Sequence, residues 1–220
     1  MTLPSVAEMR TIGIPVVHAV TTDEIVSRPD FIDTACAIIR ILGARGALHL
    51  RAGRLPGARL LSLAEGLAAA QSLTGAWLIV NDRVDIALVA GARGAQLTSR
   101  SLATGDARRV APGLAIGASV HDAEEGRIAI AAGADWLVAS RTIPVAATAT
   151  EASRRAAWVA ALARTTSVPI LAIGGVQMEH VAALRASGIH GVAVIRGIWD
   201  AANAEQAASD YLSAYDHVGE

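Results

Sequence analysis

Two adjacent glycines and a later arginine have the residue types of an anion-binding site. The apolar run 170–173 passes directly into Gly174 and Gly175, and the segment after them has helical spacing. Paired glycines let main-chain N–H groups approach a phosphate, and the positive end of a following helix favours the same anion. A later apolar run ends in Ile195 and Arg196, which adds a permanent cation. We therefore predict a phosphate site here; the alternative is a tight turn beside a solvated arginine.

A histidine and an arginine alternate along the apolar segment 46–51. An alternation of two puts Ala47, His49 and Arg51 on one face of a strand and the two leucines on the other. Bulky polar side chains on a buried strand face cost free energy unless they meet a partner or a ligand. We therefore expect His49 and Arg51 to have a role in a binding or catalytic site. The alternative is an internal hydrogen-bonded pair that only affects packing. We assign no role to His18, on the first strand-like run.

An amide and a carboxylate, Asn81 and Asp82, close the third strand-like run. Side by side, these two groups can hold a hydrated magnesium ion or a polar ligand. Asp82 could equally serve as the N-cap of the helix expected at 84–89, where its carboxylate would accept the first free N–H groups. The residues leave the two interpretations even.

A hydroxyl and an imidazole, Ser119 and His121, close the fifth strand-like run. The hydroxyl of Ser119 can donate to a phosphate or to a ring nitrogen. The imidazole of His121 titrates near neutral pH and can carry protons. The alternative for His121 is a capping position at the helix that follows.

These candidates all follow strand-like runs, and eight such runs alternate with segments of helical spacing. Strands that alternate with helices favour a parallel sheet, and eight units in about 220 residues fit a single α/β domain over 1–220, a (β/α)8 TIM barrel. In that fold the loops after the strands carry the chemistry. The expected strands are Ile14–Val20, Gly46–Arg51, Ala76–Val80, Gly94–Thr98, Leu114–Ser119, Ala134–Ala139, Val168–Ile173 and Gly191–Ile195.

Composition excludes several functions. All nineteen basic residues are arginine, so Schiff-base chemistry on a lysine is impossible. The net charge of −1 provides no field for nucleic acid, and the longest uncharged stretch, Gly66–Asn81, is too short and too polar to span a membrane. Cys36 is the only cysteine, which excludes an internal disulfide. Without a convincing signal peptide, we expect a cytoplasmic protein. Three aromatic residues on outer helices would either seal a homodimer or pack helix on helix: Trp158, Trp199 and Tyr211.

Four segments, in order and at the expected spacing, together resemble the thiamine phosphate synthase superfamily, which includes the thiazole tautomerase branch. They are Val80–Leu88, Ile116–His121, Ala132–Trp136 and Pro169–Gly175. The resemblance extends from about residue 15 to residue 200 and implies a compact (β/α)8 barrel.

The synthase joins a pyrimidine pyrophosphate to a thiazole phosphate with magnesium. By resemblance, this chain retains its amide and first metal carboxylate, its serine, its thiazole-phosphate loop and its second-strand arginine, at Asn81, Asp82, Ser119, Gly174–Gly175 and Arg51. The family's glutamine on strand two is His49, and its following lysine is Gly53. Its second metal carboxylate falls at Ser101, and its lysine-containing loop after strand six is replaced by Ser140–Thr150. Because departing pyrophosphate needs its developing charge neutralised, these differences argue against efficient synthase activity.

The tautomerase branch is similar to this chain in its His-x-Arg on strand two and in its missing second metal carboxylate. That branch moves a proton within a carboxylated thiazole phosphate, which requires an acid–base group and a phosphate anchor but no metal. Its catalytic histidine aligns with Arg141, which can bind substrate but keeps its own proton at neutral pH. Proton transfer would therefore fall to His49 or His121, and Arg51 would bind the substrate carboxylate.

The leading expectation is a tautomerase-like isomerase that needs no cofactor and acts on a small phosphorylated heterocycle. The runner-up is a thiamine phosphate synthase with magnesium at a weakened Asp82 site. The third is a non-catalytic binding protein for a phosphorylated ligand, an interpretation motivated by Arg141 and the bland stretch Val145–Thr150. Whether the chain is an enzyme stays open at this level.

Overall fold

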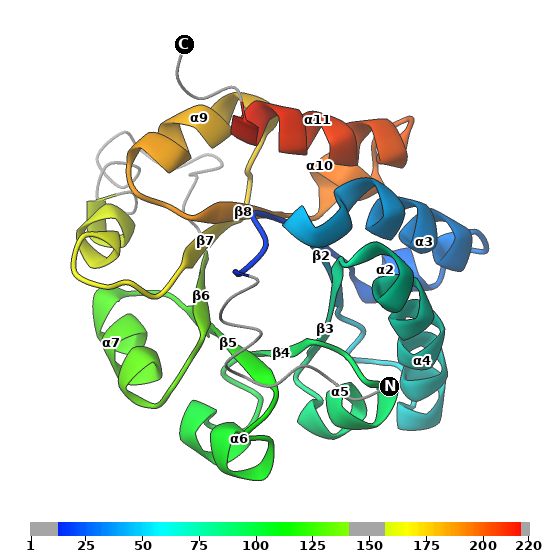
Figure 1. Cartoon of the computed structure of the whole chain (residues 1–220), viewed down its shortest axis with the longest axis horizontal. Helices are drawn as coiled ribbons and strands as arrows, with labels where there is room; N and C mark the ends of the chain where they lie inside the picture. The colour runs from blue at the N-terminus through cyan, green and yellow to red at the C-terminus, as the bar shows by residue number, and fades with distance from the viewer. Residues whose placement is uncertain (1–12, 141–156, 217–220) are drawn as a thin grey trace.

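Eight parallel strands close into a barrel in the computed structural model, which describes residues 13–140 and 157–216. Each strand pairs with the next along the chain, and β8 returns to β1. Figure 1 shows the strands around the centre and the helices outside them. The strands are β1 Val17–Val20, β2 Gly46–Leu50, β3 Trp77–Asn81, β4 Gly94–Leu97, β5 Ala115–Val120, β6 Trp136–Ser140, β7 Ile170–Ile173 and β8 Gly191–Val194. All eight expected strands are confirmed, with ends that differ from the expected ones by up to three residues. The (β/α)8 architecture is confirmed as well.

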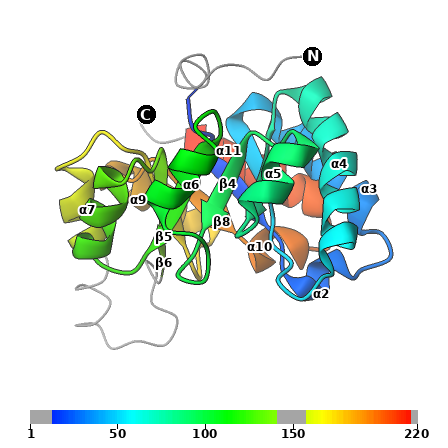
Figure 2. The ribbon, with the colours of Figure 1, turned by 90° about the horizontal axis from the view of Figure 1, so that it is seen from below.

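Helices follow the strands and cover the outside of the barrel. They are α2 Asp23–Val26, α3 Phe31–Leu42, α4 Gly57–Thr74, α5 Val84–Ala90, α6 Thr104–Val110, α7 Ala123–Ala131, a helical segment at 157–163, α9 Met178–Ala186, α10 Arg196–Trp199 and α11 Ala204–Asp216, with a short 3₁₀ turn at Gly43–Arg45. The short helices α2 and α10 directly follow β1 and β8, and Figure 2 shows both at the lower edge of the barrel. That edge is therefore the mouth, where the strands end.

The alternation expected for β2 is confirmed. Leu48 and Leu50 belong to the large apolar cluster that joins the strands to the helices. Ala47 faces the other way, into a smaller cluster that fills the barrel and includes Trp77 and Trp136. His49 lies on the same face as Ala47 and is 1% exposed. The face chosen by period two therefore puts an imidazole inside the barrel.

The barrel is filled by two tryptophans whose inward position the sequence analysis does not predict. Trp77 and Trp136 are buried and meet edge to face, with ring centroids 6.3 Å apart. Glycines make the room: a Cβ on Gly117 would lie 2.1 Å from Trp136, and one on Gly94 would lie 2.9 Å from the same ring. The two indoles therefore fill the interior of the barrel below the mouth.

The aromatic residues considered for a dimer mostly pack within the chain. Trp199 is 3% exposed and lies against Phe31, with ring centroids 5.8 Å apart, and Tyr211 is 2% exposed. Neither can form a surface patch, because each already covers the chain's own core. Within the described residues, no helix is long and apolar enough to cross a membrane. A single domain over all 220 residues stays a prediction.

Candidate functional site at the barrel mouth

A polar cavity of about 430 Å³ opens at the mouth, and all eight strands or the loops after them contribute to its wall. It brings together six of the predicted residues: His49, Arg51, Asn81, Ser119, His121 and Ile195. Four wall residues that the sequence analysis does not select lie on β4 or in the loop after it: Gln96, Thr98, Ser99 and Arg100. Their polar types directly after a strand were the signal that could have found them.

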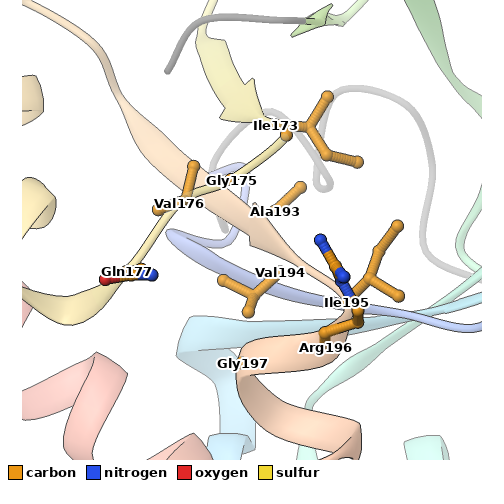
Figure 3. A pocket seen from close by; sticks show the side chains of 10 residues that line it. Ile173, Gly175, Val176, Gln177, Ala193, Val194, Ile195, Arg196 and Gly197 are labelled. Atoms are coloured by element: carbon orange, nitrogen blue, oxygen red, sulfur yellow. The ribbon is translucent and has the colours of Figure 1, made fainter. Parts of the chain in front are cut away.

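A second hollow, of about 550 Å³, adjoins the first and holds the predicted anion site. Gly174 and Gly175 line it from the turn after β7, and Arg196 lines it from the start of α10. Figure 3 shows Gly175 and Arg196 on these two segments. Ile173 and Ile195 belong to the walls of both hollows. A ligand anchored at the glycines can therefore extend into the polar cavity.

The glycine turn has the conformation that an anion site needs. Gly174 and Gly175 have φ of +100° and +70°, which favour glycine over residues with a Cβ. Both are exposed, and their main-chain N–H groups donate no hydrogen bond to any residue that the structure describes. The Tyr211 hydroxyl, 3.1 Å from the carbonyl oxygen of Val176, holds the end of the turn. The turn can thus offer main-chain donors without a change in the fold.

The helix after this turn begins at Met178, with Gln177 as its N-cap. The Gln177 N–H donates to Nδ1 of His180, 3.0 Å away, and the His180 N–H donates to the Gln177 carbonyl over 3.0 Å. The N–H groups of Met178 and Glu179 donate to no residue that the structure describes. The candidate anion donors are therefore the turn, Arg196 and the first amides of α9.

His49 is the centre of a buried polar chain. Its Nε2 lies 2.7 Å from Nδ1 of His18, and its Nδ1 lies 3.3 Å from Oδ1 of Asn81. Burial lowers the pKa of His49 to about 4, and a hydrogen bond with Asn81 opposes that shift only in part. His49 is therefore neutral at pH 7. The sequence predicts either a site role or an internal hydrogen-bonded pair for His49 and Arg51. In the structure His49 forms a hydrogen-bonded pair with His18 and not with Arg51.

Arg51 is held at the cavity by a buried hydroxyl. Its main-chain N–H donates to Oγ1 of Thr21 over 2.8 Å, and the same hydroxyl donates to the Arg51 carbonyl over 3.0 Å. Thr21 is fully buried. These two hydrogen bonds between neighbouring loops fix the backbone of Arg51, while its half-buried side chain lines the cavity.

Asp82 does not cap the helix after it. Its φ is +63°, the N-cap of α5 is Arg83, and no side chain caps that helix. Instead, Oδ1 of Asp82 accepts hydrogen bonds from two hydroxyls of the next loop, Thr98 at 2.6 Å and Ser101. The N-cap interpretation is therefore wrong: the left-handed backbone turns the carboxylate towards the loop after β4.

The donor set suits only a weakly held cation. Within the described residues, no group of three or more His, Cys, Asp or Glu side chains converges on one point. Oδ1 of Asp82 is occupied by the two hydroxyls, while its Oδ2 accepts no hydrogen bond from the described residues. One carboxylate oxygen fits a magnesium ion whose other ligands are substrate phosphates and water, and does not fit one held by protein alone.

Ser119 is held in place by Gln96, which also bonds to Trp136 inside the barrel. Oε1 of Gln96 accepts the indole N–H of Trp136 over 2.8 Å, and Nε2 of Gln96 donates to Oγ of Ser119 over 3.0 Å. Gln96 is 2% exposed. Because the Ser119 oxygen acts as an acceptor in this contact, its own hydrogen remains available for a ligand in the cavity.

His121 lies at the rim. Its side chain is half exposed and pairs with Glu125, with Nδ1 and Oε2 2.9 Å apart. Asp122 is the N-cap of α7, since its carboxylate accepts the N–H of Glu125 over 2.8 Å. The capping interpretation of His121 is therefore wrong by one residue. Arg141 and Val145–Thr150 lie outside the described residues, so their predicted roles stay predictions.

Fold and mouth together define a class of protein: a (β/α)8 barrel with a polar cavity beside a glycine turn. The family whose model matches residues 17–198 is thiamine monophosphate synthase, and the chain belongs to it. A thiamine-phosphate synthase from Methanoculleus marisnigri is 39% identical over 185 residues, which cover 81% of this chain and 85% of the relative. A second, from Pyrococcus horikoshii, is 30% identical over 179 residues, which cover 80% and 85%.

A solved structure agrees with these relatives. The thiamine phosphate pyrophosphorylase from Pyrococcus furiosus superposes with a TM-score of 0.80 at 26% identity and covers 93% of this chain and 98% of its own. The superfamily resemblance is thus confirmed, and the comparisons support a role in thiamine biosynthesis. They do not single out the tautomerase branch: the named relatives are synthases, which favours the runner-up over the leading expectation.

Proposed function

We propose that this chain makes thiamine phosphate by joining a pyrimidine pyrophosphate to a thiazole phosphate, the activity that the names of its relatives carry. The supporting observation is the pair of adjoining hollows, which share Ile173 and Ile195. With its phosphate on the amides of Gly174 and Gly175 and beside Arg196, a thiazole phosphate would extend its ring into the polar cavity. The remaining cavity would take the pyrimidine.

Charge on the leaving pyrophosphate would be met by arginines, since the chain has no lysine. Arg51 and Arg100 both line the cavity, and guanidinium groups bind phosphate oxygens in pairs. Asp82 is not itself a wall residue of the cavity but is hydrogen-bonded to Thr98, which is. Its Oδ2 would meet a magnesium ion brought by the pyrophosphate, and the ion would supply charge neutralisation on the departing group. Ser119 would donate its hydroxyl hydrogen to a ligand atom, and Asn81 would orient the ring above His49.

The test is formation of thiamine phosphate from the two substrates, measured together with magnesium-dependent release of pyrophosphate. Asp82→Asn should reduce the rate at least tenfold, because the carboxylate that meets the magnesium loses its charge. Asp85→Asn is the matched control: Asp85 lies three residues further on, is exposed, and pairs with Arg83. No pyrophosphate release by the unmodified chain, or equal rates for the two variants, would contradict the proposal.

A second candidate is proton transfer within a carboxylated thiazole phosphate. It is favoured by a neutral imidazole buried at the cavity beside Asn81, and by the two hydroxyls that occupy Asp82. His49 would take a proton from one ring position and return it at another, so that only the isomer changes. Arg51 would pair with the substrate carboxylate.

The same preparation separates the two reactions. His49→Asn should abolish isomerisation while calorimetry with thiazole phosphate shows unchanged binding, whereas Asp82→Asn should leave isomerisation intact. An active His49→Asn variant would refute the proton-transfer role. Tight binding of thiazole phosphate with turnover in neither assay would instead identify a non-catalytic binding protein and exclude both enzymes.

A further inference from the structure

A second buried histidine lies directly behind His49. His18 is fully buried on β1, and its ring centroid lies 5.0 Å from that of His49 on the neighbouring strand. Nδ1 of His18 is 2.7 Å from Nε2 of His49, and Nε2 of His18 is 2.9 Å from the carbonyl oxygen of Pro15. The two imidazoles therefore continue one chain from the N-terminal end of β1 to the cavity.

The Pro15 carbonyl decides where the protons of this chain reside. A carbonyl oxygen only accepts, so Nε2 of His18 must carry the hydrogen that bonds to it. Burial holds the pKa of His18 well below its usual value, so the ring is neutral and its Nδ1 keeps a lone pair. Nε2 of His49 must then donate to that lone pair. The neutral His49 ring has one hydrogen, which leaves a lone pair on its Nδ1.

We propose that His18 is a positioning residue that fixes His49 in the tautomer with hydrogen on Nε2 and a lone pair on Nδ1, beside Asn81 at the cavity. His49 is thereby presented to a ligand as a proton acceptor and not as a donor. This inference rests on the proposed function only in assigning His49 an action on the substrate; the tautomer itself follows from the contacts with Pro15 and His18.

The tautomer also constrains Asn81. Oδ1 of Asn81 lies 3.3 Å from Nδ1 of His49, and two acceptors do not attract each other. The proposed tautomer therefore requires the Asn81 amide to turn over from the orientation in the structure, so that its NH₂ group faces Nδ1 while His49 is neutral. Once Nδ1 receives a proton, the amide turns back and Oδ1 accepts that hydrogen. Proton uptake by His49 thus changes whether a ligand meets the oxygen or the NH₂ group of Asn81.

The charged and titratable groups around the pair are few among the described residues. His190, in the loop before β8, acts on His18 through space and donates its own Nε2–H to the Ile14 carbonyl over 2.7 Å. Arg51 lies two residues beyond His49 on the same strand face, at the cavity. No carboxylate contacts either imidazole in the described part of the chain, so none draws the proton of His49 to Nδ1.

The direct test is nitrogen NMR of the full chain labelled with ¹⁵N-histidine, which needs no substrate. One-bond N–H couplings at pH 7 show which nitrogen of each of the six histidines carries hydrogen, and single substitutions assign the signals. We expect hydrogen on Nε2 alone for both His18 and His49. Hydrogen on Nδ1 of His49 would overturn the proposal even if the chain proved inactive in every assay.

Variants then separate positioning from mere packing. His18→Leu should release His49 into a mixture of tautomers and lower kcat of whichever reaction is found about tenfold, with KM little changed. His18→Gln should restore the single tautomer, because its amide can donate to Pro15 and accept from His49. His190→Leu is the matched control and should leave the His49 spectrum unchanged. If His18→Leu leaves the His49 couplings as they were, the inference fails; if that variant does not fold, the spectrum of the unmodified chain decides.

Discussion

Acidification should destabilise this protein through His49, and the size of the effect follows from its burial. The folded pKa of this imidazole is about 4, against an ordinary value of 6.5, because burial opposes the charged form. In the unfolded chain the ring accepts a proton below pH 6.5, while the folded chain resists it. The contribution of neutral His49 is therefore complete above pH 6.5 and is lost as the pH falls towards 4. A shift of this size corresponds to about 3 kcal/mol of unfolding free energy.

The assay compares the unmodified chain with His49→Asn by urea unfolding at several pH values. Carboxylates titrate in both proteins, so the difference between them reports on His49 together with its buried partner His18. We expect the difference in unfolding free energy to change by about 3 kcal/mol between pH 7 and pH 4, in the direction that favours the variant at low pH. Parallel stability curves would refute the reasoning, because they would mean that the imidazole titrates alike in the folded and unfolded chain.

Three further predictions concern the residues that build the mouth. Gln96→Leu should lower the unfolding free energy by about 1–3 kcal/mol, since the indole N–H of Trp136 is left buried without an acceptor. In a Trp136→Phe background this loss of unfolding free energy should largely vanish. An unchanged loss in that background, measured by urea unfolding, would contradict the explanation. Gly117→Ala should destabilise by about 1–3 kcal/mol, measured by thermal unfolding, because its Cβ would lie 2.1 Å from the Trp136 ring; a neutral effect would show that the ring moves aside. Arg196→Met should weaken thiazole phosphate binding about tenfold in calorimetry, while Arg54→Met, at an exposed arginine of another loop, should not; equal effects would exclude a specific anion site.

Local pattern was sufficient for the elements and for the direction of single side chains. The period of two in β2 placed His49 inside because alternation is a property of the extended backbone itself. The two glycines after β7 are predicted to bind a phosphate through their main-chain N–H groups; their positive φ values show the turn, and the phosphate stays a prediction. Local pattern was insufficient where tertiary partners compete for a side chain. From sequence Asp82 could be the N-cap of the next helix, but its carboxylate instead accepts hydrogen bonds from hydroxyls 16 and 19 residues further along the chain.

The sequence by itself determined the eight strands, their parallel order and several polar groups at the mouth, since these follow from local spacing and from the alternation of strands with helices. It missed the four polar wall residues on β4 and in the loop after it. Only the closed barrel decided which of these groups meet. His18 and His49 are 31 residues apart and Gln96 and Trp136 are 40 apart, and each pair forms because barrel closure brings inward-facing side chains of different strands to one level. No local period encodes that stagger, so the contact between the two imidazoles became visible only in three dimensions.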